Sequence, residues 1–270
     1  MTDPELSAHF TSANFVAGGA DGATWRQDGN EMVMADEWVK AIAGAQRSIH
    51  IASGHFRLRP VAEALLAKKR AQPDIDIKVY LDQQEYISVS GLRDQMLKVD
   101  TCLATATTEA KRLACTMREY LFSRDLANGG IDVRIKAYAY RWDNAYAAQM
   151  HNKYMIVDGN TLIAGSYNLS VNAEHDTFEN AVRITGSSYA ATVTAYERDF
   201  TRLWNQGGTA ALDELKQQIA TAPTIPLVWK PLALTLDQFT EVKNAVRAAC
   251  PAADSAAFRT NPGAHRTCTR

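Results

Sequence analysis

A segment of thirty residues, 151–180, constrains the fold of this chain more than any other part of its sequence. It is typical of a β-hairpin: residues 153–157 are apolar and β-prone, Asp158-Gly159 is a tight-turn dipeptide, and residues 161–166 form the returning strand. Side chains alternate between the two faces of a strand, so residues two apart point the same way. The hairpin therefore predicts a polar patch on one face, at the ends of both strands.

Four polar residues form this predicted patch. His151 and Lys153 point the same way on the first strand, and Ser166 and Asn168 do so on the second if that strand stays extended. Gly165 lies beside them, and its missing side chain permits close backbone approach. An ammonium, a hydroxyl and an amide can all donate hydrogen bonds to a phosphate, so phosphate is the predicted ligand.

The segments before the hairpin have the pattern of a sheet covered by helices. Residues 48–53 and 74–82 read as strands, the second with strict alternation of apolar and polar residues, and a helix begins near Pro60 between them. Strand–helix–strand is the unit of a parallel sheet. The chain is therefore predicted to be an α/β protein with a mixed, largely parallel β-sheet flanked by helices on both faces.

Apolar periodicity and turn residues place the remaining elements. Helices are expected at 34–46, 107–130, 188–205 and 235–250, and extended segments at 131–142 and 179–184. Residues 83–107 are less regular, and residues 208–234, with three prolines, read as a surface connection. We expect a catalytic domain at 1–207 and an extension at 208–270 that carries one helix and packs on the same domain.

Composition limits the partners and the location of this protein. The formal net charge is -1, so any nucleic-acid contact must rest on a local patch. No apolar run approaches the roughly 20 residues that span a membrane, so no stable membrane association is expected. The polar and acidic N-terminus is not typical of a signal peptide, although a removed signal would leave no trace in the sequence.

The chain has four cysteines, whose spacing matches no zinc motif. Four cysteines allow three connectivities, and we favour Cys102–Cys115 with Cys250–Cys268 because Cys268 stands in a polar tail unsuited to burial. Paired cysteines would favour a periplasmic or secreted protein. The alternative is four unrelated thiols in a cytoplasmic protein.

The hairpin residues also carry a family resemblance. The pattern resembles the signature of the phospholipase D superfamily at six positions: His151, Lys153, Asp158, Gly165, Ser166 and Asn168. Six fixed residues at about one in twenty each arise by chance about once in 10⁷–10⁸ trials. The chain is most similar to the small bacterial endonucleases of that superfamily with one motif per chain, over roughly residues 24–207. Residues 83–107, about 143–149 and those after 208 exceed the compact family pattern.

The resemblance implies a phospholipase D-like α-β-α sandwich and a phosphodiesterase that needs neither metal nor cofactor. His151 would attack phosphorus and form a phosphohistidine, which divides one displacement into two easier ones. By the resemblance, Glu179 would hold the other ring N–H, with Glu174 and Asp176 as weaker candidates.

The other motif residues have separate expected roles. Lys153, Ser166 and Asn168 would bind the non-bridging phosphate oxygens and stabilise the charge of the transition state. Asp158 and Gly165 belong to the motif, but Asp158 occupies the turn and we expect a structural role for it.

The reaction also needs a general acid for the leaving oxygen. Single-motif chains of the superfamily obtain it by dimerising, so the resemblance implies a homodimer with His151 of both protomers in one cleft. The alternative is a monomer in which His55 or His175 lines the cleft and acts as the acid.

Three classes of function remain after the sequence alone. The leading prediction is an endonuclease that cleaves DNA or RNA. The alternative is a phospholipase D or phosphatidyl transferase acting on phospholipid head groups, which would need an apolar groove or an interfacial helix. A catalytically inactive binding protein is disfavoured because the complete set of motif residues is present.

Overall fold

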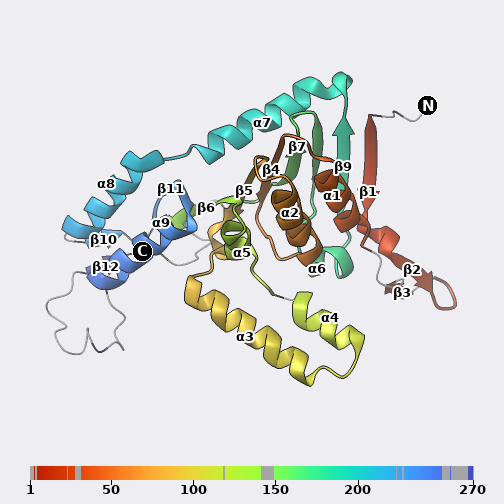
Figure 1. Ribbon diagram of the computed structural model, residues 1–270, viewed down its shortest axis with the longest axis horizontal. Helices are drawn as coiled ribbons and strands as arrows, with labels where there is room; N and C mark the ends of the chain where they lie inside the picture. Colours follow the sequence, from red (N-terminus) through yellow and green to blue (C-terminus); the bar gives the residue numbers. More distant parts are fainter. Residues whose placement is uncertain are drawn as a thin grey trace.

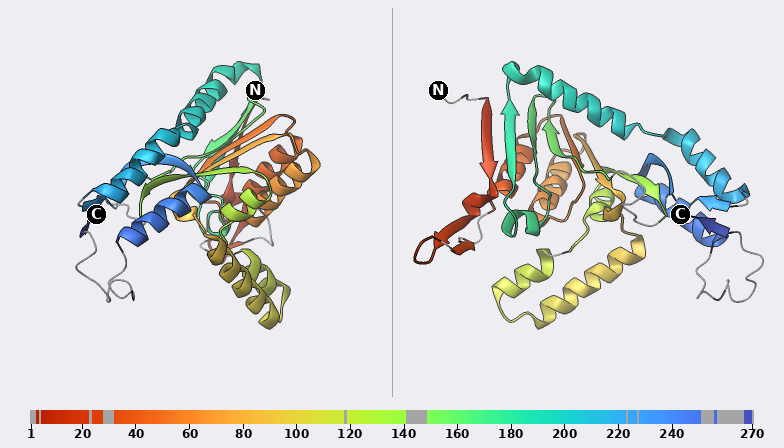
Figure 2. Two further views of the ribbon diagram at one scale, coloured as in Figure 1. Left: turned by 60° about the vertical axis from the view of Figure 1, so that its left-hand side comes forward. Right: turned by 180° about the vertical axis from the view of Figure 1, so that it is seen from behind.

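The centre of the fold is an eight-stranded mixed sheet with helices on both faces (Figures 1 and 2). The computed structural model describes residues 3, 5–22, 24–27, 32–117, 119–140, 149–222, 224–226, 228–250, 256 and 267–269. In order across the sheet, the strands are β1 (Leu6–Phe10), β9 (Asn180–Thr185), β8 (Thr161–Gly165), β7 (Lys153–Val157), β4 (Ser48–Ser53), β5 (Asp76–Asp82), β6 (Asp132–Ala139) and β11 (Val228–Thr235).

The predicted α/β class and the helices on both faces are confirmed, but the prediction of a largely parallel sheet is wrong. Among the described pairings of this eight-stranded sheet, β4–β5 and β5–β6 are parallel and the other five are antiparallel. The parallel strands are joined by helical crossovers, whereas β7 and β8 are joined by the three residues 158–160. A connection this short can only produce an antiparallel pair, and the strand–helix–strand pattern describes only the first half of the sheet.

Two apolar clusters attach the helices to the sheet. On one face, α1 (Val33–Gly44) and α2 (Arg59–Ala71) contribute Trp38 and Leu65 to a cluster that contains Ile51 of β4. On the other face, α7 (Ala190–Trp204) places Phe200 and Trp204 in a cluster with residues of β7 and β8. Figure 2 shows the sheet between these two helical layers.

Residues 83–107 were expected to be irregular, but they contain a 17-residue helix, α3 (Val89–Thr105). Its N-terminus is capped by Ser88, whose hydroxyl accepts a hydrogen bond from the backbone N–H of Gly91 at 3.0 Å. The predicted helix at 107–130 is divided into α4 (Glu109–Met117) and α5 (Ser123–Asn128). Glu119, in the described residues between them, has φ +58°, a conformation that no helix continues.

Helices α3 and α4 form a hairpin that projects from the body of the molecule (Figure 1). The predicted disulfide Cys102–Cys115 is confirmed and joins the two helices with a Cα–Cα distance of 5.7 Å. Cys250 is also disulfide-bonded. The side chain of its predicted partner, Cys268, lies outside the described part, so that pairing stays a prediction.

Near the N-terminus, the described residues form three strands. Strand β1 lies at the sheet edge, and β2 (Phe15–Gly18) and β3 (Thr24–Gln27) form a hairpin. The 3-10 helices are η1 (Thr11–Asn14), η2 (Gln83–Glu85) and η3 (Ser187–Tyr189).

The C-terminal extension was expected to carry one helix, but it has α8 (Gly208–Thr221) as well as α9 (Leu236–Ala249). Thr235 and Gln238 form a capping box that begins α9. Strand β11 pairs with β6, so the extension contributes a strand to the main sheet. A short parallel pair, β10 (Thr224–Pro226) with β12 (Thr267–Thr269), lies outside that sheet. Among the described residues, no helix has the length and apolar character needed to cross a membrane.

Candidate active site

Apart from Asp158 in the β7–β8 turn, the motif residues lie at one edge of the sheet, and α6 (Val171–His175) follows them in the chain. Strand β4 ends at this edge, and the antiparallel strand β7 begins there, with Lys153 paired to Ser53. His151 stands two residues before the pairing begins, and Gly165 ends the neighbouring strand β8. This antiparallel register, rather than a parallel crossover, brings the two halves of the motif together.

His151 is exposed to solvent and lines a cavity of about 570 Å³ between the sheet and α7. Lys153 and Gly165 line the same cavity. Within the described residues, the His151 imidazole makes no hydrogen bond. Both ring nitrogens can therefore reach a ligand or a second protein chain.

Lys153 is only 8% exposed. Its ammonium donates a hydrogen bond to the backbone carbonyl of His151 at 3.0 Å. Burial lowers the pKa of Lys153, and the nearby Glu179 carboxylate offsets part of that effect. A positive charge with little water around it is well suited to attract a phosphate oxygen.

Glu179 is held at the start of β9 by two hydroxyl groups. Ser166 Oγ donates to one carboxylate oxygen at 2.5 Å, and Thr177 Oγ1 donates to the other at 2.8 Å. The backbone N–H of Glu179 donates to Thr11 Oγ1 at 2.7 Å. The structure thus brings Ser166 and Glu179 together. It does not join Glu179 to His151 by a hydrogen bond, and that pairing stays a prediction.

Gly165 stands where two strands approach closely. A Cβ atom at this position would lie 2.1 Å from the carbonyl oxygen of Asn180 and 2.7 Å from the Cα of Ala181. Any side chain would therefore separate β8 from β9 at the point where Ser166 meets Glu179.

Asn168 does not line the cavity of His151, because β8 ends at Gly165 and the strand alternation does not continue to Asn168. Instead, Asn168 lines a second cavity of about 280 Å³ together with His55. Its Oδ1 atom is buried and has no hydrogen-bond partner among the described residues. The predicted polar patch is therefore divided: His151 and Lys153 line one cavity, and Asn168 lines the other.

Asp158 has φ +54° in the hairpin turn and binds backbone rather than open solvent. Its carboxylate accepts hydrogen bonds from the N–H groups of Gln46, Arg47 and Ser48, at 2.7 to 3.2 Å. Burial acts to raise the pKa of Asp158, but these hydrogen bonds hold it below its ordinary value. The turn is thereby fastened to the segment that leads into β4.

His55 forms a pair with a carboxylate that sequence reasoning missed. Its Nδ1 lies 3.2 Å from Glu85, which is fully buried and also binds the guanidinium of Arg57 at 3.0 Å. His55 and Glu85 follow the ends of β4 and β5, two adjacent parallel strands. Polar residues just after such strands meet at one edge, and this signal was available in the sequence.

The remaining candidate residues occupy different places. Glu174 is buried and accepts hydrogen bonds from Asn14, from Tyr167 and from two backbone N–H groups at the start of α1, which gives it a structural position. Asp176 lines the second cavity. His175 ends α6 and lines neither of the two cavities.

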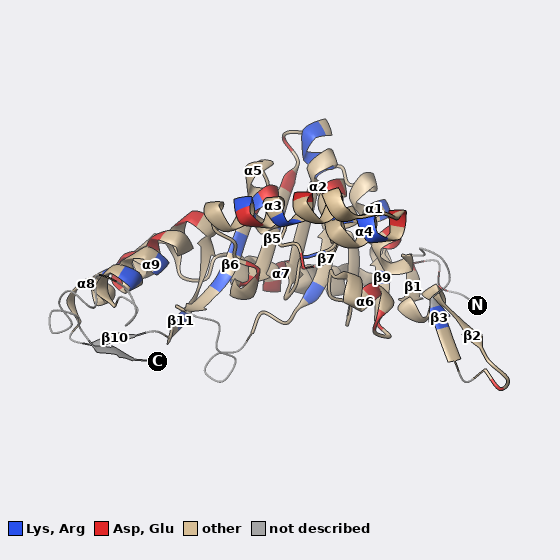
Figure 3. Ribbon diagram, turned by 90° about the horizontal axis from the view of Figure 1, so that it is seen from below, with Lys and Arg blue, Asp and Glu red and all other residues tan. Residues whose placement is uncertain are grey.

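The charge of the described surface is mixed. Lys and Arg residues are interspersed with Asp and Glu over the helices (Figure 3), in line with the net charge of -1. Within the described ranges, no group of three or more His, Cys, Asp or Glu side chains is arranged to hold a metal ion.

A family model and a curated protein are similar to parts of this chain. The family described as "Cardiolipin synthase, PLD-like domain" matches residues 38–204, more than half of the chain. Mitochondrial cardiolipin hydrolase of Xenopus tropicalis is 35% identical over 81 residues, which are 30% of this chain and 37% of that protein. The chain thus spans little more than a third of that relative.

Solved structures include similar folds. Nuc from Salmonella typhimurium, a phospholipase D family member, is 21% identical, with a TM-score of 0.45 over 74% of this chain and 95% of that one. NucT from Helicobacter pylori is 16% identical, with a TM-score of 0.41 over 73% of this chain and 97% of that one. The family match, which includes every residue of the motif, shows that this chain belongs to the phospholipase D superfamily of phosphodiesterases.

Proposed function

We propose that the protein is an endonuclease that cleaves phosphodiesters of DNA or RNA through a phosphohistidine on His151, without a metal ion. The observation that carries this proposal is that His151, an exposed imidazole with no hydrogen-bond partner among the described residues, lines one cavity with Lys153, whose buried ammonium binds the His151 backbone carbonyl. A nucleophile beside a desolvated positive charge suits attack on an anionic phosphodiester.

The proposed reaction has two steps. In the first, a ring nitrogen of His151 attacks phosphorus, the P–O bond to the leaving oxygen breaks, and a general acid protonates that oxygen. In the second, the same group takes a proton from water, the water oxygen attacks phosphorus, and the P–N bond breaks. Lys153 stabilises the charge on the phosphate oxygens in both steps, and Asn168 contributes an amide from the second cavity.

Glu179 and Ser166 have supporting roles in this scheme. Glu179 orients His151 when substrate or a second chain is present, and Ser166 holds the Glu179 carboxylate in place through the 2.5 Å hydrogen bond. The proximity of Glu179 to Lys153 also keeps the ammonium charged.

We propose that His151 of the partner subunit is the general acid, in a homodimer with a shared cleft. An apolar strip beside the His151 cavity supports this arrangement. Val182 lines that cavity, and the register of β1 with β9 puts Leu6 and Phe10 on the same face of the sheet. Their exposure of 38%, 41% and 51% leaves apolar surface that a second copy would bury.

A nuclease is favoured over a lipid enzyme because both cavities at the site edge are lined mainly by polar side chains. The second candidate, hydrolysis of a phospholipid diester, is supported by the partial likeness to the cardiolipin hydrolase. Both candidates share the histidine chemistry and differ in what flanks the phosphate.

One assay tests the chemistry and the substrate class. The protein is incubated in excess EDTA with single- and double-stranded DNA, RNA, phosphatidylcholine and cardiolipin, alongside His151→Ala. His9→Ala is the matched control, because His9 lies near Glu37 of α1 rather than in the site. We expect nucleic-acid cleavage that is lost only in His151→Ala. Cleavage of lipid alone would replace the nuclease proposal, and full activity in His151→Ala would overturn the mechanism.

Light scattering tests the homodimer. A dimer is expected at the concentrations at which the enzyme is active. A monomer that retains full specific activity on dilution would contradict the shared cleft. The role of general acid would then be assigned to His55.

A further inference from the structure

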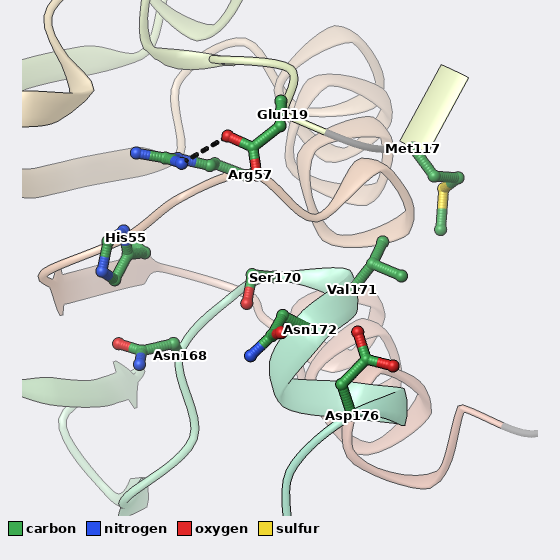
Figure 4. A pocket seen from close by; sticks show the side chains of 9 residues that line it. All are labelled: His55, Arg57, Met117, Glu119, Asn168, Ser170, Val171, Asn172 and Asp176. Atoms are coloured by element: carbon green, nitrogen blue, oxygen red, sulfur yellow. Dashed lines mark hydrogen bonds and ion pairs between the residues drawn. The ribbon is translucent and has the colours of Figure 1, made fainter. Parts of the chain in front are cut away.

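The cavity that contains Asn168 lies between α6, the segment after β4 and the end of α4 (Figure 4). Its volume of about 280 Å³ is near the lower limit of sites that hold a small ligand, about 300 Å³. The proposed function assigns Asn168 to the phosphate, and Asn168 lines this cavity, so on that proposal a ligand group in the cavity flanks the scissile phosphate. The residues that line the cavity therefore indicate which chemical group flanks the scissile phosphate.

The charge of the lining does not suit a second phosphate. The guanidinium of Arg57 is occupied by two carboxylates, with Nη1 2.9 Å from Glu119 and Nη2 3.0 Å from Glu85. Asp176 adds a further carboxylate to the lining. The formal charge around the cavity is thus negative, which repels a phosphate and favours a neutral or cationic group.

The lining includes several hydrogen-bond acceptors. Asn168 Oδ1 is buried and has no partner in the described part of the chain, and Glu119 and Asp176 can only accept when ionised. These acceptors favour a ligand that presents N–H donors.

The shape of the lining suits a flat ring. The side chains of Met117 and Val171 form an apolar wall on one side of the cavity (Figure 4). Arg57 lines another side, and its two carboxylate partners fix the plane of its guanidinium. Nucleobases stack on guanidinium planes and on apolar side chains.

We propose that this cavity binds an unpaired nucleobase with an exocyclic amino group, adjacent to the scissile phosphate. The inference rests on the proposed nuclease function and defines its substrate. Adenine, cytosine and guanine offer amino donors to the carboxylates, whereas thymine and uracil offer two carbonyls and one N–H. A base can enter only when it is unstacked and unpaired, so the enzyme acts on single strands.

The test uses short single-stranded oligonucleotides that differ in one base beside the cleavage position. For wild type, we expect kcat/KM to be roughly ten- to a hundredfold higher with adenine, cytosine or guanine than with thymine, the effect of one or two hydrogen bonds to charged groups. The same sequences as duplexes should be cut at least tenfold more slowly.

Two variants assign this preference to the cavity. Glu119→Gln and Asp176→Asn replace an acceptor by an amide that can also donate, so the ratio of amino-bearing to thymine substrates should fall towards one. Glu214→Gln is the matched control, because Glu214 lies on α8 outside the cavity, and it should keep the wild-type ratio.

The outcomes separate this inference from the proposed function. Cleavage without base preference, a preference that both variants retain, or equal cleavage of duplexes would overturn the inference and leave the nuclease standing. If no oligonucleotide is cut, fluorescence anisotropy with His151→Ala decides: equal binding of all four bases overturns the cavity assignment. If the variants instead impair cleavage of phosphatidylethanolamine alone, the cavity binds an amine head group and the nucleobase assignment is wrong.

Discussion

The hydroxyl of Ser166 lies 2.5 Å from the carboxylate of Glu179, and this contact joins the end of the motif hairpin to the start of β9. The same carboxylate is close enough to Lys153 to influence its pKa. Two motif residues, Ser166 and Lys153, are thus coupled through the carboxylate of Glu179, and a change at one of them should affect the other.

Glu179→Gln should lower kcat/KM by roughly a hundredfold, because a hydrogen bond to a charged group and the stabilisation of the Lys153 charge are lost together. Ser166→Ala should lower kcat/KM roughly tenfold, since the Glu179 carboxylate remains but loses one of the hydroxyl groups that hold it. Steady-state kinetics of both variants and of the double variant would measure the coupling. Losses that multiply fully in the double variant would show that the two residues act independently.

The pH dependence of activity should reveal the buried lysine. Burial lowers the pKa of Lys153, so the ammonium loses its proton at a lower pH than an ordinary lysine and activity should fall in that range. Lys153→Arg keeps the charge at all accessible pH values and should move this alkaline decline upwards, even if its overall rate is lower. This shift would be visible in the profile of kcat/KM between pH 6 and 11, roughly the range below and around an ordinary lysine pKa. An unchanged decline in Lys153→Arg would assign the titration to another group.

The Asp158 turn should contribute stability that depends on pH. The folded pKa of Asp158 lies below its ordinary value of 3.8, so the contribution is complete above that value and is lost as the pH falls through the folded value. Asp158→Asn tolerates the same left-handed backbone but removes the charge. Urea unfolding should show a loss of about 1 kcal/mol at pH 7 that shrinks in acid. A loss that stays constant with pH would mean that the charge is irrelevant.

Gly165→Ala should destabilise the fold by about 2–3 kcal/mol, because the new Cβ would lie 2.1 Å from the Asn180 carbonyl oxygen. Gly44→Ala is the control: a Cβ there meets nothing within 4 Å, and helix propensity should add about 0.5 kcal/mol of stability. Thermal or urea unfolding measures both. Equal effects of the two substitutions would show that β8 and β9 separate without cost.

Removal of the Cys102–Cys115 disulfide should loosen the helical hairpin more than the sheet. The bond closes a 13-residue separation, for which chain entropy predicts a loss of about 3 kcal/mol that is local to the hairpin. Cys102→Ser with Cys115→Ser should speed amide exchange in α3 and α4 and reduce the base preference, since Met117 at the end of α4 lines the second cavity. Unchanged exchange in α3 and α4 would show that packing alone holds the hairpin.

Much of the local structure follows from the sequence alone. Alternation of apolar residues predicts β5, the Asp158-Gly159 turn predicts the β7–β8 hairpin, and Thr235 with Gln238 predicts the start of α9. These features depend on neighbours a few residues apart, which periodicity and turn chemistry describe directly. The spacing of the motif residues likewise indicates the superfamily without any tertiary contact.

Other features depend on segments far apart in the chain. The order of strands and the pairing of β1 with β9 arise from contacts between distant segments, and their energies do not appear in any local pattern. The separation of His151 from Asn168 into two cavities has the same origin, because it follows from where β8 stops pairing. Local sequence therefore determined which residues carry the chemistry. Only the tertiary structure decided which of them share a space, because strand pairing and burial are set by long-range packing.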